Sequence, residues 1–297
     1  MPSKPSKPRL LWLQGVTCNG NTHSFLNLPY LAQLLERFDL LYHPLLPSLE
    51  TLESVVRCNH TCDVLVFEGA FDPQMTRAGR SLSELVAHYG ACADHIIAAG
   101  SCASFGGVLA AAAPERSSGL AFREAERAGP VGSAVHKLIN LPGCPVHPEW
   151  LGYALMMVAD DRLVALDALQ RPKALYSHLV HDGCLRNEYF EWKVDAKQFG
   201  MKEGCLFYEH GCRGPLTHGS CNRTLWNGVG SKMRSGTPCF GCTEPDFPRR
   251  NLFETKTNMS IPEEVPIGVS KRSYLTLTGI AKSFRIKRLE ERLIDDD

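Results

Sequence analysis

Twelve cysteines and eleven histidines give this chain of 297 residues an unusual stock of metal ligands. Thiolate sulfur and imidazole nitrogen are the side chains that soft and borderline transition metals prefer. Secreted proteins that use many cysteines for disulfides are normally much shorter than this chain. In a reducing compartment, this many thiols indicates metal or redox cofactors. The spacing of the cysteines should therefore show which cofactor the chain can hold.

Three cysteines each follow a predicted strand. Cys18 lies in GVTCNGN, Cys102 in GSCASFGG and Cys144 in PGCPVHP. The carboxyl ends of parallel strands share one edge of a sheet, so we expect these thiolates to converge there. Glu68 ends another strand at the same edge, where it either caps a helix or takes part in function. The neighbouring glycines allow the backbone to approach a bulky inorganic core.

Three other cysteines do not fit this pattern. Cys58 and Cys62 precede a predicted strand, and Cys92 lies between a helix and a strand. They should lie at the opposite edge of the sheet. We interpret them as buried thiols that act as small hydrophobic side chains.

A denser group of seven candidate ligands follows in the C-terminal half. It divides into a set of four and a set of three: His181, Cys184, Cys205 and Cys212; then Cys221, Cys239 and Cys242. The set of four could hold a tetrahedral zinc ion or an iron–sulfur cluster. A set of three thiolates suits a cluster that has lost one iron, whereas zinc would need a fourth ligand. The spacing favours iron–sulfur clusters, and a zinc-stabilised interaction scaffold is the alternative.

Apolar runs that read as buried strands alternate with helical patterns through residues 9–165. The strands are predicted at 10–15, 38–43, 63–69, 94–100 and 136–143, and the helices at 24–38, 48–57, 81–90 and 148–165. Such alternation predicts an α/β fold with a doubly wound parallel sheet. Residues 1–8 are expected to form a flexible arm. Residues 166–252 are rich in glycine, cysteine and aromatic side chains and should need cofactors to fold. Residues 253–297 are expected to form a charged, solvated tail.

Charge and hydropathy exclude several functions. Lysine plus arginine and aspartate plus glutamate both total 32, so no basic field exists to bind nucleic acid. No apolar run approaches the roughly 18–20 residues of a membrane span. The first residues lack an export signal. We therefore expect a cytoplasmic protein, which includes a peripheral position at the inner face of the cytoplasmic membrane.

The chain resembles the small, electron-transferring subunit of nickel–iron hydrogenases. The resemblance spans about residues 9–248, through the segments LLWLQGVTCNGNTHSFLN, VFEGA, GSCASFGG, PGCPVHPEW, HDGC, GCRGP, SCNRTLWN and PCFGCTEPDFP. It implies a flavodoxin-like domain with a proximal cluster, followed by an irregular cysteine-rich domain with medial and distal clusters. By position, Cys18, Cys102 and Cys144 resemble the proximal ligands. Cys221, Cys239 and Cys242 resemble the medial ligands, and the set that begins at His181 resembles the distal ligands.

Two features depart from the family pattern. The first family motif is usually C-x2-C, but Asn21 stands in the place of its second cysteine. This predicts a three-iron proximal cluster or a four-iron cluster with an unusual ligand. The spacing from Cys205 to Cys212 is one residue longer than the family leads us to expect, so the distal cluster could hold three or four irons. The medial cluster is expected to be a three-iron cluster.

The resemblance also implies partners. The nickel–iron centre of the family is built from paired C-x2-C motifs, and this chain has a single C-x2-C, Cys239 to Cys242. The catalytic metal should therefore lie in a large subunit, with a higher oligomer of such heterodimers. We expect a cytosolic uptake type that oxidises hydrogen and sends electrons through three clusters to a quinone. Alternatives are a hydrogen-sensing relative and the related cluster-bearing subunit of respiratory complexes.

Overall fold

The computed structural model describes residues 7–284, and its contacts divide the chain into two compact units. The first, here called the sheet unit, comprises residues 1–175 and 243–247. The second, here called the cysteine-rich unit, comprises residues 176–242 and 248–297. Most of the predicted N-terminal arm and the end of the predicted tail, residues 1–6 and 285–297, lie outside the described residues.

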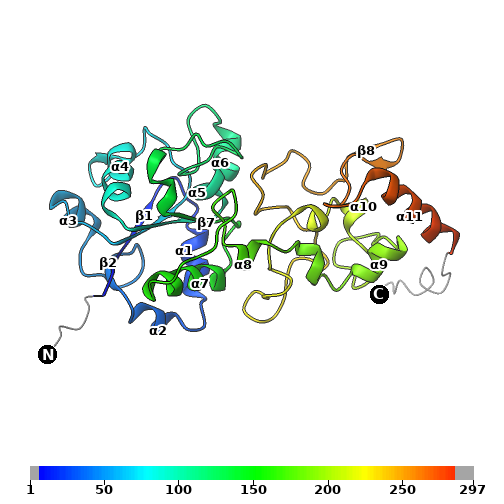
Figure 1. The fold of residues 1–297 in the computed structure, drawn as a ribbon, viewed down its shortest axis with the longest axis horizontal. Helices are drawn as coiled ribbons and strands as arrows, with labels where there is room; N and C mark the ends of the chain where they lie inside the picture. Colours follow the sequence, from blue (N-terminus) through cyan, green and yellow to red (C-terminus); the bar gives the residue numbers. More distant parts are fainter. Residues whose placement is uncertain (1–6, 285–297) are drawn as a thin grey trace. The chain divides into compact units, whose positions relative to one another are not determined.

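The sheet unit is built on a five-stranded parallel sheet with the order β2-β1-β3-β6-β7 (Figure 1). Its strands are β1 (Arg9–Gln14), β2 (Asp39–Tyr42), β3 (Val64–Glu68), β6 (His95–Ala99) and β7 (Leu138–Leu141). The strand order reverses at β1 and β3, since β2 lies on one side of β1 and the later strands lie on the other. This is the switch point where doubly wound folds bind ligands. This order is flavodoxin-like and confirms the predicted fold class.

Helices cover both faces of the sheet, which explains the continuous apolar strands (Figure 1). The helices are α1 (Gly20–Leu26), α2 (Leu31–Leu35), α3 (Leu52–Arg57), α4 (Leu82–Cys92), α5 (Ser101–Phe105), α6 (Gly107–Ala112) and α7 (Pro148–Ala159). Leu11 and Leu65 share one buried cluster with Val55 of α3 and Leu85 of α4. Trp12 faces the opposite way and packs on Phe25 of α1, with 5.4 Å between ring centroids.

The structure refines the predicted elements. The helix expected over 24–38 is two helices, because Pro29 has no N–H to continue the hydrogen-bond ladder. The helix expected over 148–165 ends at Ala159. Short elements that the sequence did not predict are the hairpin β4 (Thr76–Arg77) and β5 (Arg80–Ser81), the 3-10 helix η1 (Gly132–Lys137) and α8 (Lys173–Tyr176).

The cysteine-rich unit has only short elements and one longer helix. They are η2 (Val180–Gly183), α9 (Asn187–Trp192), α10 (Phe207–His210), η3 (Gly214–Leu216), β8 (Thr257–Asn258), β9 (Ile261–Pro262) and α11 (Lys271–Ser283). Tyr274 of α11 is buried against Phe207, with 6.4 Å between ring centroids. Residues 253–284 of the predicted tail therefore contribute to this unit. No helix within residues 7–284 is long and apolar enough to cross a membrane.

Candidate functional site

The structure places the first three candidate ligands at the carboxyl edge of the sheet. Cys18 follows β1, Cys102 lies in α5 directly after β6, and Cys144 follows β7. Cys18 and Cys144 are exposed, and Cys102 is half-buried. Burial raises the pKa of the Cys102 thiol, and the nearby Cys18 raises it further. An exposed set of thiols at this edge could meet both a cofactor and a partner surface.

Hydrogen bonds tie the loops that carry these cysteines. The Gly143 N–H donates to Ser101 Oγ over 2.9 Å, and the Ser101 N–H donates to Gly143 O over 3.0 Å. Ser24 Oγ donates to Val146 O over 2.5 Å, and the Val146 N–H donates to Asn21 Oδ1 over 2.8 Å. These hydrogen bonds therefore join the loops after β1, β6 and β7 to one another.

Asn21 has a structural part in this arrangement that the sequence did not reveal. Its side chain is buried, and a Cβ atom added at Gly100 would lie 2.5 Å from Asn21 Oδ1. The amide therefore fills the space between the three loops, and only glycine fits opposite it. The backbone φ of Gly100, +88°, also favours glycine.

Glu68 anchors the start of α1. Its fully buried carboxylate accepts the N–H groups of Asn21 and Thr22, each over 3.0 Å. Thr22 Oγ1, Gln14 Nε2 and Trp12 Nε1 also donate to it. Burial raises the pKa of Glu68, but these hydrogen bonds outweigh it and hold the pKa below its ordinary value. The geometry is that of an ionised carboxylate that caps a helix.

Glycines let the backbone approach two of the candidate ligand sulfurs closely. A Cβ atom at Gly20 would lie 3.2 Å from Cys18 Sγ, and one at Gly107 would lie 3.0 Å from Cys102 Sγ. A side chain at either position would crowd the thiol. The sulfur donors and the nearby glycine backbone fit an inorganic core held by thiolates.

The four predicted distal ligands line one small cavity in the cysteine-rich unit. Its walls include His181, Cys184, Cys205 and Cys212. Backbone N–H groups point at the sulfurs: Arg186 donates to Cys184 Sγ over 3.4 Å, and Phe207 donates to Cys205 Sγ over 3.4 Å. Such N–H to sulfur bonds are a means by which proteins tune cluster potentials. Among the described residues, no three His, Cys, Asp or Glu side chains are gathered tightly enough to hold a single metal ion.

Burial controls the protonation of this set. It raises the pKa of both Cys205 and Cys212 to about 12. It lowers the pKa of His181, which favours the neutral imidazole that binds metals. Buried thiols must lose protons to bind a metal. A positively charged inorganic core in this cavity would stabilise the resulting thiolates.

The remaining three cysteines also lie together. Burial raises the pKa of Cys221 and Cys239, and the charge of Cys242 raises both further. The Gly241 N–H donates to Cys239 Sγ over 3.4 Å. The Cys239 N–H donates to Cys212 Sγ over 3.3 Å, so the set of three and the set of four adjoin.

Arg186 is a buried residue of this site that the sequence did not reveal. Its guanidinium donates to four backbone carbonyls, those of Met201, Glu203, Gly204 and Met233. It therefore holds the chain on both sides of the cavity and places a positive charge near Cys184. Nothing in the letters GCLRNE distinguishes it from a surface arginine.

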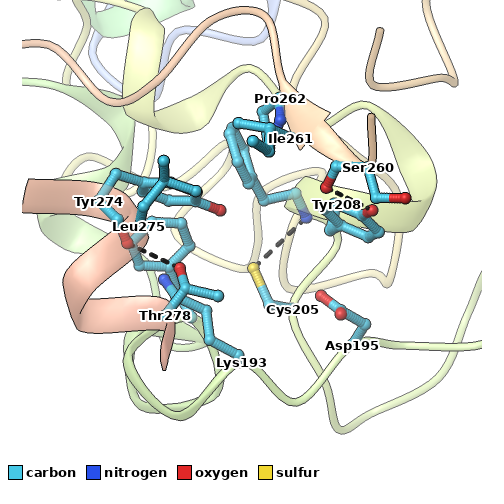
Figure 2. Close-up of a pocket in the computed structure, with 12 residues that line it drawn as sticks. Lys193, Asp195, Cys205, Tyr208, Ser260, Ile261, Pro262, Tyr274, Leu275 and Thr278 are labelled. Carbon is cyan, nitrogen blue, oxygen red and sulfur yellow. Dashed lines mark hydrogen bonds between the residues drawn. The ribbon is translucent and has the colours of Figure 1, made fainter. Parts of the chain in front are cut away.

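A second pocket lies on the other side of Cys205 (Figure 2). Its volume is about 140 Å³, and Phe190, Phe207 and Tyr274 supply aromatic walls. Lys193 Nζ lies 3.9 Å from the centroid of the Phe190 ring and 4.8 Å from that of the Tyr274 ring. This pocket could not be predicted, because Tyr274 lies in the predicted tail.

The three cysteines interpreted as buried thiols differ in environment. Cys62 is buried and Cys92 is half-buried, but Cys58 is exposed, so the interpretation is wrong for Cys58. Cys58 lies directly after the short helix α3, where it turns outward.

Two family descriptions match the chain. Residues 18–158 match the 20 kDa subunit of NADH ubiquinone oxidoreductase, and residues 176–254 match the C-terminal region of NiFe/NiFeSe hydrogenase small subunits. The chain is 32% identical to a periplasmic [NiFe] hydrogenase small subunit of Solidesulfovibrio fructosivorans, over 81% of this chain and 79% of that one. It is 31% identical to an uptake hydrogenase small subunit of Cupriavidus necator, over 85% and 73%.

The fold has a close counterpart among solved structures. A chain of the recombinant [NiFeSe] hydrogenase from Desulfovibrio vulgaris Hildenborough superposes with a TM-score of 0.70 at 26% identity, covering 84% of this chain and 98% of that one. The sheet and the thiol sets define a flavodoxin-like protein equipped for iron–sulfur clusters. The chain belongs to the family of nickel–iron hydrogenase small subunits. It is the electron-transfer subunit of an oxidoreductase complex, binds iron–sulfur clusters and pairs with a large subunit.

Proposed function

We propose that this subunit relays electrons from the large subunit through three iron–sulfur clusters to a quinone during hydrogen oxidation. The observation that carries the proposal is the grouping of ten candidate ligands into three sets. One set lies at the sheet edge, one lines the cavity of the cysteine-rich unit, and one adjoins it through Cys239. Bound at these sets, clusters would supply reversible one-electron chemistry.

Each set gives its cluster a different environment. Cys18, Cys102 and Cys144 would hold the proximal cluster near solvent, at a surface that a large subunit could cover. Cys221, Cys239 and Cys242 would hold a medial three-iron cluster. The set that includes His181 would hold the distal cluster, with its neutral imidazole as one ligand. Replacing thiolate by imidazole makes a cluster less anionic and raises its potential.

The pocket beside Cys205 supports a quinone acceptor. Phe190, Phe207 and Tyr274 could stack on a quinone ring, and Figure 2 shows the Cys205 sulfur at the pocket wall. Lys193 lies over two of these rings, where its ammonium could donate to a quinone oxygen. A Phe207→Ala variant should raise the KM for a soluble quinone analogue and leave reduction of methyl viologen unchanged. An unchanged KM would contradict the quinone assignment.

The cytosolic uptake type and the higher oligomer are parts of the same proposal. The segment that contains Cys18 and Asn21 resembles the cytosolic uptake branch, and the Cupriavidus necator relative is named an uptake enzyme. Cell fractionation and the native mass of the complex test both. Co-purification with a nickel-containing chain, together with iron, sulfide and paramagnetic resonance measurements, tests the three clusters.

Asn21 provides the sharpest test of the proximal set. An Asn21→Cys variant would add a fourth thiolate, make the bound cluster more anionic and lower its potential. An Asn21→Ala variant is the matched control, because it loses the hydrogen bond to Val146 without adding a thiolate. A potential in the cysteine variant that equals or exceeds that of the wild type would reject the assignment.

A further inference from the structure

The sheet unit brings two thiols together at the edge opposite the candidate ligands. Cys62 precedes β3 and Cys92 ends α4. The chain segments that carry them are joined where the Asp94 N–H donates to Asp63 O over 2.9 Å. Cys62 lies close enough to Cys92 for its thiol and its backbone N–H to interact with Cys92 Sγ, and the Cys92 thiol itself donates to Tyr89 O over 3.6 Å. Both residues are free thiols.

The two thiols have unequal environments. Cys62 is 1% exposed and belongs to the hydrophobic core, whereas Cys92 is half-buried at its margin. Lys137 Nζ donates to Ala91 O over 3.0 Å and to Ala93 O over 2.8 Å. This ammonium neutralises the negative end of α4, which would otherwise oppose a thiolate at Cys92.

The acidity of the pair follows this asymmetry. The hydrogen bond from Cys62 lowers the pKa of Cys92 to about 6, and the nearby His88 lowers it further. The same hydrogen bond, together with burial, raises the pKa of Cys62. Cys92 is thus the nucleophilic thiol that solvent can reach, and Cys62 is the resolving thiol in contact with it.

We propose that Cys62 and Cys92 form a reversible dithiol–disulfide couple that exchanges with low-molecular-weight disulfides such as oxidised glutathione. The Cys92 thiolate attacks one glutathione sulfur, which breaks the glutathione disulfide and releases one glutathione thiolate. Cys62 then gives its proton to solvent and attacks Cys92 Sγ, which releases the second glutathione. Counted from two thiols, the protein loses two electrons and two protons, one from each sulfur, and these reduce one glutathione disulfide to two thiols.

The backbone beside the pair lies within the range that a disulfide needs. Val64 pairs with His95 in the parallel ladder of β3 and β6. Neighbouring strands lie about 4.8 Å apart, and disulfides join Cα atoms roughly 4.4–6.8 Å apart. The bond would join the start of β3 to the end of α4. The five residues of β3 span about 16 Å at roughly 3.3 Å per residue, so the pair is separated from the ligand edge. The inference is therefore independent of the proposed cluster ligands.

Differential alkylation of the purified complex tests the proposal. The complex is incubated without oxygen in oxidised glutathione, quenched in acid, denatured, alkylated and mapped by mass spectrometry. We expect a Cys62–Cys92 cross-linked peptide, about tenfold more abundant than any cross-link to Cys58 and removed by dithiothreitol. The exposed Cys58 should form a mixed disulfide with glutathione and should not go on to form a disulfide with another cysteine of the protein.

Two variants separate the roles. In Cys62→Ser, Cys92 should accumulate as a stable glutathione adduct, and in Cys92→Ser, Cys62 should stay unmodified. Unchanged iron content and hydrogen oxidation before treatment show that each variant is folded. The wild-type result decides the proposal if either variant fails to fold. A glutathione adduct on Cys58 without a Cys62–Cys92 cross-link would overturn it, as would a cross-link that dithiothreitol does not reverse.

Discussion

In the sheet unit, aliphatic and aromatic side chains are buried on both faces of the sheet, and the candidate ligands Cys18, Cys102 and Cys144 stand outside this packing at the sheet edge. In the cysteine-rich unit, Cys205, Cys212 and Cys239 are themselves buried members of the small hydrophobic clusters. We therefore expect the sheet unit to fold without a cofactor. In the cysteine-rich unit, we expect cofactor binding and folding to be coupled.

Local structure shows the same contrast. The loops of the sheet unit are joined by hydrogen bonds such as those of Asn21 and Ser101, none of which needs a metal. In the cysteine-rich unit, backbone N–H groups of Arg186, Phe207 and Cys239 point at sulfur atoms. Thiols are weak acceptors, whereas metal-bound thiolates are strong ones. The hydrogen bonds of the cysteine-rich unit should therefore reach their full strength only when its sulfurs are metal-bound thiolates.

Removal of iron should produce the largest difference in stability between the two units. A chelator with a reductant should release the clusters and destabilise the cysteine-rich unit by about 10 kcal/mol, by analogy with structural metals. Hydrogen exchange of peptides from residues 176–242 should rise to that of an unfolded chain. Peptides that contain β3 and β6 should keep their protection. Equal loss of protection in both units would refute the contrast.

Two cysteine variants sharpen the comparison one ligand at a time. Cys212→Ser removes a buried ligand and should lower the free energy of unfolding of its unit by about 5 kcal/mol, with loss of distal iron. Cys102→Ser should remove proximal iron but change the stability of the sheet unit by less than about 1 kcal/mol. Iron content and hydrogen exchange measure both. The comparison fails if Cys102→Ser is the more destabilising variant.

The fold of the sheet unit could be predicted because its signals are local. Each buried strand is an uninterrupted apolar run that ends in a turn, as in the segment that contains Leu65 and Glu68. Cysteines that follow such strands must lie at one edge, so Cys18, Cys102 and Cys144 could be placed by topology alone. The break at Pro29 was missed because the apolar pattern continues across it.

The cysteine-rich unit could be predicted only as a set of ligands. Its chain has no sustained period of 2 or 3.6 residues, so the spacing of the ligands could be read but the conformation of the chain could not. Arg186 and Tyr274 were missed because their burial depends on contacts with distant segments, the carbonyl of Met233 and the ring of Phe207. The contact between Cys62 and Cys92 was missed for the same reason.

Arg186 should contribute strongly to the stability of the cysteine-rich unit and not to that of the sheet unit. Arg186→Met would leave four carbonyls without their donor and should cost about 4 kcal/mol. Lysine should rescue little, because one ammonium cannot reproduce the planar fork. Arg234→Met is the control, since Arg234 is exposed and also lies near Cys184. Hydrogen exchange of residues 201–205 provides the measurement, and equal effects of the two methionine variants would argue against this role.

Glu68 should contribute a smaller amount to stability than Arg186, and only in the sheet unit. Glu68→Gln keeps the size of the side chain but replaces a carboxylate oxygen by a donor that faces Thr22 Oγ1 and Trp12 Nε1, which should cost about 2 kcal/mol. The variant should retain its proximal iron, because the contacts of Glu68 are with α1 and β1. Loss of iron with unchanged stability would instead favour a direct role at the cluster.

The pH dependence of this cost follows from the lowered pKa of Glu68. A carboxyl whose pKa falls on folding stabilises the native state fully above its ordinary value of 4.5. That contribution disappears as the pH falls through the lower folded pKa, so the difference between wild type and Glu68→Gln should narrow in acid. Glu84→Gln is the matched control, since Glu84 also caps a helix start, that of α4, but is exposed. Its effect should stay below about 0.5 kcal/mol, because water replaces the lost hydrogen bonds.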